Sequence, residues 1–150
     1  SRDPAGAAGR WDRETAAGEA RGWGMRVVHV APSRAEALAA VEAPFMSYQG
    51  KMAMLRSDRT GGSVPNSFDR NLLRLRPFEE YLNAGWTHLG TPDEVREGLE
   101  RYMETTGMRR LLLLMALPGI ATDLALRSMR MFMDHVAPKL SAATARAVSG

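Results

Sequence analysis

The sequence predicts an α/β fold, because aliphatic segments typical of buried strands alternate with amphipathic segments of helical period. The last two helical segments are also followed by the breakers Gly107 and Pro138. Strands that alternate with helices pair in parallel through right-handed crossovers. We therefore expect a parallel sheet against which the helices pack.

The first strand and helix are predicted between residues 25 and 48. Residues 25–31 are apolar and partly β-branched, as in a buried strand, and a proline follows. Ser33 and Glu36 then have the spacing of a capping box. We expect an amphipathic helix over residues 34–48, bent at Pro44.

The stretch 50–77 is the least regular part of the chain. Its first residues could extend the preceding helix, whereas 59–66 have the composition of a loop. Two interpretations stay open: a lid over a ligand, with arginines such as Arg56, Arg59 and Arg70 available to a charged group, or a disordered surface loop. A short helix over 78–83 follows this stretch.

The last part of the chain contains two more strand–helix units. Residues 86–90 predict a short strand, and Thr91 with the proline after it predicts a capped helix that ends at Gly107. Residues 110–117 predict a strand that is apolar on both faces. Thr122 or the aspartate after it would cap the final helix. Residues 1–24 are expected to be a loose lead-in and 141–150 a flexible tail.

The composition narrows the possible functions. The chain has 150 residues, 45% hydrophobic and 25% charged, which is typical of one globular domain. It contains no cysteine, so a disulfide framework or thiolate site is excluded, and its three histidines have no metal-site spacing. The net charge of +3 is small and the arginines are interspersed with acids, which argues against nucleic acid. No apolar run is long enough for a membrane helix, so we expect a cytoplasmic protein that holds no metal.

The order of motifs from residue 25 to 140 resembles that of the bacterial-luciferase-like flavin-dependent monooxygenases. That family typically has a strand followed by a Glu-Ala helix, a Gly-Thr-Pro-x-x-Val turn, an aliphatic strand after a glycine, and a closing helix with Ser, Phe and Val-x-Pro. The matching segments in this sequence are Val27–Ala31 with Glu36-Ala37, Gly90–Val95, Gly107–Leu114, Ser128–Phe132 and Val136–Leu140.

The resemblance implies the C-terminal part of a (β/α)8 TIM barrel that binds reduced FMN, or F420 in some relatives. In that family, dioxygen reacts with the reduced flavin and a small organic substrate is oxygenated. The stretch 50–77 then corresponds to the lid found in the later half of the barrel.

A complete barrel needs eight strands and about 250 residues, and this sequence predicts three strands. The chain begins with Ser1, so we expect further polypeptide upstream. Three readings stay open: part of a longer monooxygenase, a half-length protein completed by a second chain or by a homo-oligomer, or a non-catalytic interaction module derived from the barrel.

Candidate site residues lie at the C-terminal ends of the predicted strands, where barrel active sites form. His88 is the candidate catalytic residue, as a hydrogen-bond donor or general acid, and the alternative is a histidine satisfied by the backbone. Gly90 and Thr91 offer amides to a cofactor phosphate, although helix capping competes with that role. The candidate substrate-pocket residues are His29, Trp86 and Met115.

Overall fold

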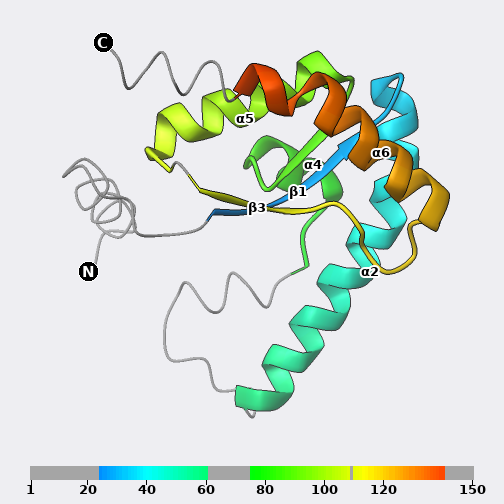
Figure 1. Cartoon of the computed structure of the whole chain (residues 1–150). Helices are drawn as coiled ribbons and strands as arrows, with labels where there is room; N and C mark the ends of the chain where they lie inside the picture. Colours follow the sequence, from blue (N-terminus) through cyan, green and yellow to red (C-terminus); the bar gives the residue numbers. More distant parts are fainter. Residues whose placement is uncertain (1–23, 61–74, 109, 141–150) are drawn as a thin grey trace.

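A computed structural model of the chain describes residues 24–60, 75–108 and 110–140 (Figure 1). Its elements confirm the predicted alternation of strands and helices. The predicted tail and nearly all of the predicted lead-in lie outside the described residues, as do residues 61–74 of the predicted lid. The elements are β1 (Gly24–Val30), α2 (Arg34–Thr60), α4 (Phe78–Asn83), β2 (Thr87–Gly90), α5 (Pro92–Thr106), β3 (Leu111–Leu114) and α6 (Thr122–His135).

The three strands form one parallel sheet in the order β2-β1-β3. The C-terminal half of β1 pairs with β2, and its N-terminal half pairs with β3, so that Val27 lies opposite both Thr87 and Leu114. In a (β/α)8 barrel, strands that are consecutive along the chain are neighbours. Here the first strand lies between the second and the third, so the described residues show a small parallel α/β sheet, and they do not show a barrel.

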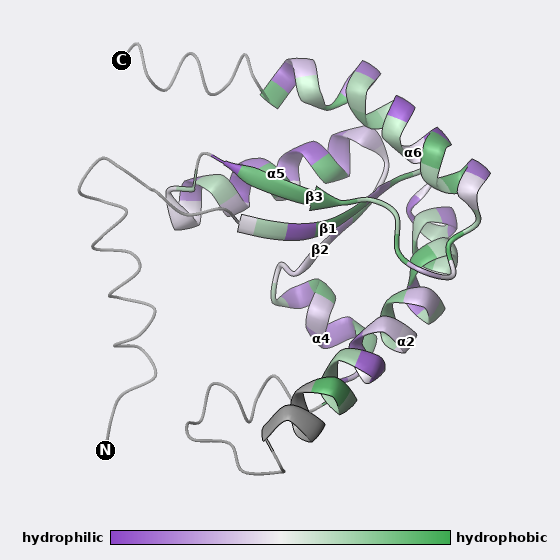
Figure 2. Cartoon of the chain, turned by 60° about the horizontal axis from the view of Figure 1, so that its bottom comes forward, coloured by the Kyte–Doolittle hydropathy of each residue, from purple (hydrophilic) through white to green (hydrophobic). Residues whose placement is uncertain are grey.

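Helices cover both faces of this sheet (Figures 1 and 2). α2 and α4 lie on one face, and α5 and α6 lie on the other. Because successive side chains of a strand point to opposite faces, Val28 and Val30 pack under α5 and α6, while Val27 and Ala31 pack against α2 and α4. The central strand therefore contributes to two hydrophobic clusters.

Aromatic rings hold α2 and α4 together on the first face. The ring of Phe45 lies 5.7 Å from that of Phe78 and 5.1 Å from that of Tyr81, with the second pair edge to face. Such contacts add about 0.5–1.5 kcal/mol beyond the burial of apolar area. On the second face, Val95, Leu99 and Val136 are completely buried.

The first helix is longer than the sequence predicts. α2 continues through Pro44 to Thr60, so the first residues of the stretch predicted as irregular, 50–60, are helical. A proline in a helix interior usually ends or kinks the helix, because it removes one amide and crowds the preceding turn. Burial of Val41 and Phe45 on either side of Pro44 helps to keep the helix continuous.

The third strand and the final helix also differ from the prediction. β3 spans only Leu111–Leu114, and its residue Leu112 is 54% exposed, so the strand is not covered on both faces. α6 has Ala121 at its N-cap with no side-chain cap, so neither Thr122 nor Asp123 caps it.

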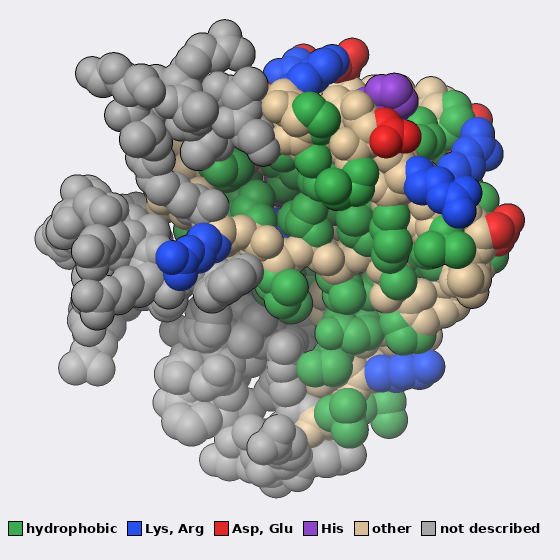
Figure 3. Space-filling model, in the orientation of Figure 1, with side chains coloured by type: hydrophobic (Ala, Val, Ile, Leu, Met, Phe, Trp, Pro, Cys, Tyr) green, Lys and Arg blue, Asp and Glu red, His purple; other side chains and the backbone are tan. Residues whose placement is uncertain are grey.

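Hydrophobic side chains are exposed over β3 and α6 (Figure 3). The large exposed hydrophobic residues of these two elements are Leu112, Leu124, Leu126 and Met133, which we call the β3–α6 face. Within the described ranges, no helix combines the length and the hydropathy that crossing a bilayer requires.

Candidate functional site

A large cavity among the described residues runs beside β2, the edge strand next to α4 and α5. Its volume is about 620 Å³, within the range of about 300–1,000 Å³ that is usual for ligand pockets. We call it the β2 groove. Its charged and aromatic lining residues are Arg26, Arg34, His88, Glu94, Glu97, Arg101 and Tyr102.

His88 lies in the wall of the β2 groove, beneath α5. It pairs in register with Val28, so its side chain points to the face that α5 covers. A glycine of α5 makes room for the ring: a Cβ at Gly98 would lie 2.7 Å from Nδ1 of His88. The ring of Tyr102, one turn further along α5, lies 6.1 Å from the imidazole. The groove thus places a histidine and a tyrosine beside each other.

His88 is neutral at physiological pH. Its side chain is 8% exposed, and burial together with the positive charge of Arg26 lowers the pKa of His88 to about 4. Only about one molecule in a thousand is then protonated at pH 7. Its Nε2 is buried and has no hydrogen-bond partner among the described residues. The geometry favours a neutral hydrogen-bond donor or acceptor over a general acid.

Three arginines line the β2 groove, and two of them, Arg26 and Arg34, make contacts within the chain. The guanidinium of Arg26 lies 3.9 Å from the ring centroid of Tyr102, its Nε is buried without a partner, and burial lowers its pKa. Arg34 of α2 donates to the carbonyl of Leu89 at 3.1 Å and lies 3.9 Å from the carboxylate of Glu94. Arg34 therefore links α2 to the end of β2 across the mouth of the groove.

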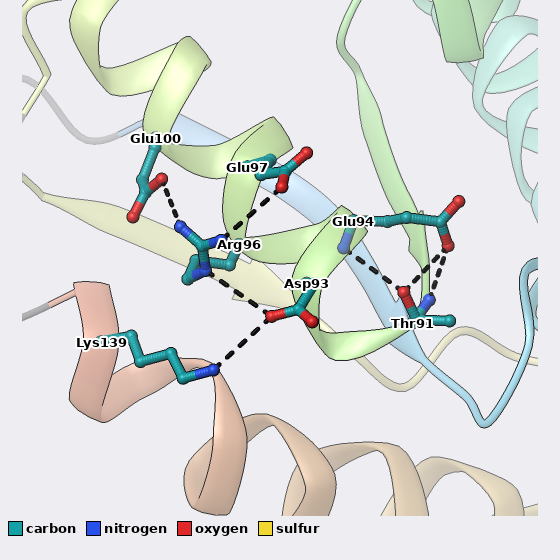
Figure 4. A network of polar contacts seen from close by, with 7 residues as sticks. All are labelled: Thr91, Asp93, Glu94, Arg96, Glu97, Glu100 and Lys139. Carbon is teal, nitrogen blue, oxygen red and sulfur yellow. Dashed lines mark hydrogen bonds and ion pairs between the residues drawn. The ribbon is translucent and has the colours of Figure 1, made fainter.

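Of the two amides predicted to hold a phosphate, that of Thr91 is bonded to a side chain of the same helix (Figure 4). The amide of Thr91 donates to the carboxylate of Glu94 at 2.9 Å, and the hydroxyl of Thr91 accepts from the amide of Glu94 at 3.4 Å. Any Cβ at Gly90 would collide with the same carboxylate. Thr91 and Glu94 thus form a capping box, so Thr91 has the helix-capping role that competes with phosphate binding.

Beyond this cap, Arg96 forms ion pairs with acidic side chains of α5 (Figure 4). It donates to Glu100 at 2.8 Å, a contact that raises the pKa of Arg96, and lies within 3.9 Å of Asp93. Asp93 also lies 3.5 Å from the ammonium group of Lys139, just after α6. Such exposed ion pairs add little to the free energy of folding. The pair of Asp93 and Lys139 nevertheless links the start of α5 to the residues that follow α6.

A second, smaller pocket lies at the carboxyl end of β1, between α2 and α6. Its volume is about 310 Å³, and His29 forms part of its wall. His29 is 3% exposed, and burial lowers its pKa, so this ring is neutral as well. We call this the β1–α6 pocket.

The structure separates the candidate residues that the sequence analysis grouped. His29 and His88 lie on opposite faces of the sheet, in different pockets. Trp86 is 41% exposed and packs edge to face on Tyr81, 6.1 Å between centroids, while Met115 packs against the hydrophobic cluster under α5 and α6. Neither of these two residues lines the two pockets described above.

Several lining residues were not singled out from the sequence: Arg26, Arg34, Gly98, Arg101, Tyr102 and Arg127. One usable signal was Gly98, because a glycine inside a helix costs up to about 1 kcal/mol and often marks close packing. The arginines of the helices, Arg34, Arg101 and Arg127, carried no such signal, since their spacing is that of an ordinary solvated helix face.

Comparisons with known proteins bear on the fold. No protein-family model matches the chain, and no curated protein matches it significantly. Among solved structures, it is similar to the monooxygenase RslO1 from Streptomyces bottropensis, with a TM-score of 0.51 and 21% sequence identity. The match covers 91% of this chain and 39% of that protein, so the chain spans well under half of its structural relative. At this identity the likeness establishes a shared α/β fold with part of a monooxygenase.

Proposed function

We propose that the chain is part of a flavin-dependent monooxygenase of the luciferase-like type, acting on a small organic substrate with dioxygen. Reduced FMN is the proposed cofactor, with F420 as the second candidate. The observation that carries the proposal is the structural match to a monooxygenase over 91% of the chain. The ordered motifs between residues 25 and 140 support it independently.

The β2 groove fits such a cofactor in size and in chemistry. Arg101 is exposed, lines the groove and has no ion pair among the described residues, so it can receive a phosphate. Tyr102 and His88 offer ring surface and one neutral hydrogen-bonding nitrogen. The half-buried charge of Arg26 suits an electron-rich ring system beside it.

The chain's own residues would therefore bind and orient the cofactor. Reduced flavin, when bound, supplies the electrons with which dioxygen is activated. Arg26 and Tyr102 provide fixed charge and an aromatic wall, and His88 holds one hydrogen bond without changing its own charge. A complete luciferase-like barrel would need further strands from outside the described residues. These residues supply three, in the order β2-β1-β3.

Flavin binding by the purified chain tests this proposal. Equilibrium dialysis with reduced FMN under argon should give close to one flavin per chain, and Arg101→Gln should weaken binding about fivefold by removing the phosphate partner. The matched control is Arg130→Gln, an exposed arginine on α6 that does not line the β2 groove. Failure of the chain, and of the longer protein that contains it, to retain FMN or F420 would contradict the proposal.

A second candidate function is a non-catalytic partner subunit or interaction module. The exposed β3–α6 face favours it, because contiguous apolar surface commonly marks a site of protein contact. The same dialysis separates the candidates: flavin held by the chain alone excludes an inert module, whereas flavin held only after addition of a second chain supports a completed, shared site.

A further inference from the structure

The β1–α6 pocket exists because β3 does not follow β1 to its end. β3 pairs only with Gly24–Val27, so no strand of the described residues pairs with the C-terminal half of β1 on that side. The amides of Val27 and Ala31 point toward β2, and that of Val30 therefore points toward the vacant side. There it donates to the hydroxyl of Ser128 on α6, at 2.8 Å, and the hydrogen bond is buried.

The position of this pocket is one at which open α/β sheets bind ligands. From β1 the chain passes to α2 on one face, and from β3 it passes to α6 on the other. The two connections diverge between neighbouring strands, which creates a crevice at the carboxyl ends of the strands. The pocket of about 310 Å³ lies there, between Ala39 of α2 and Leu124 of α6.

The wall of the pocket contains one buried polar side chain that nothing satisfies. His29 is 3% exposed, its Nδ1 is buried, and neither ring nitrogen has a hydrogen-bond partner among the described residues. The remaining lining is mostly apolar, from Val30, Ala31, Ala39 and Leu124. Buried polar groups are normally satisfied, so an unpartnered imidazole in a pocket wall indicates a partner from outside the chain.

The rim of the pocket carries one charge of each sign. Glu36 lies at the rim, and its carboxylate accepts a hydrogen bond from the hydroxyl of Ser33 at 3.3 Å. Arg127, also at the rim, is exposed and makes no ion pair within the described residues. A carboxylate is the natural partner for this guanidinium.

We propose that the β1–α6 pocket binds a small organic acid with a planar, apolar body. Its carboxylate pairs with Arg127, its body lies against Val30, Ala39 and Leu124, and a polar atom at its far end hydrogen-bonds to His29. The site is separate from the β2 groove and does not depend on flavin, so it goes beyond the proposed function.

The probe is 4-hydroxybenzoate, which has a carboxylate, an apolar ring and a hydroxyl group. Titration of the isotope-labelled chain, without flavin, is followed by two-dimensional NMR of backbone amides and of the histidine rings. We expect saturable binding with a Kd of about 1 mM or tighter. The shifts should include the ring of His29 and the amides of Ala31 and Leu124, and should leave the ring of His88 unchanged.

Variants and analogues identify each contact. Arg127→Gln should weaken 4-hydroxybenzoate binding about fivefold, while the matched control Arg130→Gln should not. The neutral analogue 4-hydroxybenzyl alcohol should bind more weakly than 4-hydroxybenzoate, and Arg127→Gln should leave its affinity unchanged. His29→Gln should abolish the difference in affinity between 4-hydroxybenzoate and benzoate. If that variant does not fold, Arg127→Gln with its control Arg130→Gln, together with the neutral analogue, still tests the proposal.

Two results would overturn the proposal. One is the absence of saturable shifts up to concentrations far above 1 mM. The other is binding that maps to the β2 groove or responds equally to both arginine substitutions. Neither result bears on flavin binding, so the proposed oxygenase function is tested separately.

Discussion

Ser128 provides the hydrogen-bond partner of the Val30 amide. This amide of β1 points to the side of the sheet on which β3 pairs only with Gly24–Val27. Ser128 is completely buried, and its hydroxyl accepts from the amide of Val30 at 2.8 Å. Ser128→Ala would leave that amide buried without a partner, and we expect a loss of about 1–3 kcal/mol in the free energy of unfolding. Urea denaturation measures the loss. Thr122→Ala, at an exposed position of the same helix, should change it by less than about 0.5 kcal/mol.

The buried histidines make stability depend on pH. In the folded chain the pKa of His88 is about 4, and that of His29 is also lowered, whereas unfolding returns both toward 6.5. Between pH 6.5 and about 4 the unfolded chain therefore binds protons that the folded chain does not. This contribution to stability is fully present above pH 6.5 and decreases as the pH falls through that window.

His88→Gln should reduce this pH dependence. Urea midpoints measured from pH 8 down to pH 4 should fall less steeply in the variant than in the wild type, whatever the variant's stability at pH 8. His135→Gln is the control, because His135 is exposed at the end of α6. Equal slopes for His88→Gln and the wild type would show that His88 is not the group that titrates.

Sequence reasoning found both pocket histidines but not the groups around them. His29 and His88 are visible because each is a polar residue inside an apolar strand. Arg26 and Tyr102 are 76 positions apart, and only the packing of α5 on β1 brings them together. Local pattern carries no information about such a contact, so the position of the Arg26 charge, which adds to burial in lowering the pKa of His88, was not predictable.

At the scale of elements, α5 was the most predictable helix because its signals are local. Thr91 and the proline after it predict the capped helix start that the structure has, and Gly107 adopts the left-handed conformation that ends the helix. α2 was less predictable: a proline signals a helix end, while the burial that keeps this helix intact depends on α4 and the sheet.

Thr91→Ala should destabilise the protein by about 1 kcal/mol, because it frees the amide of Glu94 and removes the hydroxyl partner of the Glu94 carboxylate. Thermal or urea unfolding measures the change. The control is Thr105→Ala, at an exposed position near the other end of α5, where alanine's better helix propensity predicts no loss. Similar losses in both variants would mean that the cap contributes nothing specific.

At the scale of the whole molecule, the sequence predicted the α/β class but not the order of the strands. Alternating strands and helices specify parallel pairing, yet β1 pairs with strands that lie 60 and 87 positions further along the chain. Its hydrophobic pattern, apolar on both sides, fits either the centre of an open sheet or a strand of a barrel. The helices on both faces are what distinguish the two, and these are visible only in three dimensions.

The open sheet leaves β3 with one edge that no described strand covers, next to the exposed side chains of the β3–α6 face. An apolar edge strand of this kind tends to pair with another chain. We expect the purified chain to associate reversibly, with itself or with a chain that completes the sheet, and a charge at the centre of this surface should oppose that association.

Leu112→Lys tests this expectation, because Leu112 is 54% exposed and its replacement removes no core contact. Sedimentation velocity over a concentration series should show that the wild-type chain gains mass as concentration rises, and that the variant remains closer to the monomer at unchanged stability. Met54→Lys is the matched control, since Met54 is 68% exposed on α2, away from β3 and α6. A wild-type chain that stays monomeric throughout, or a control that dissociates as readily as Leu112→Lys, would show that the β3–α6 face does not mediate assembly.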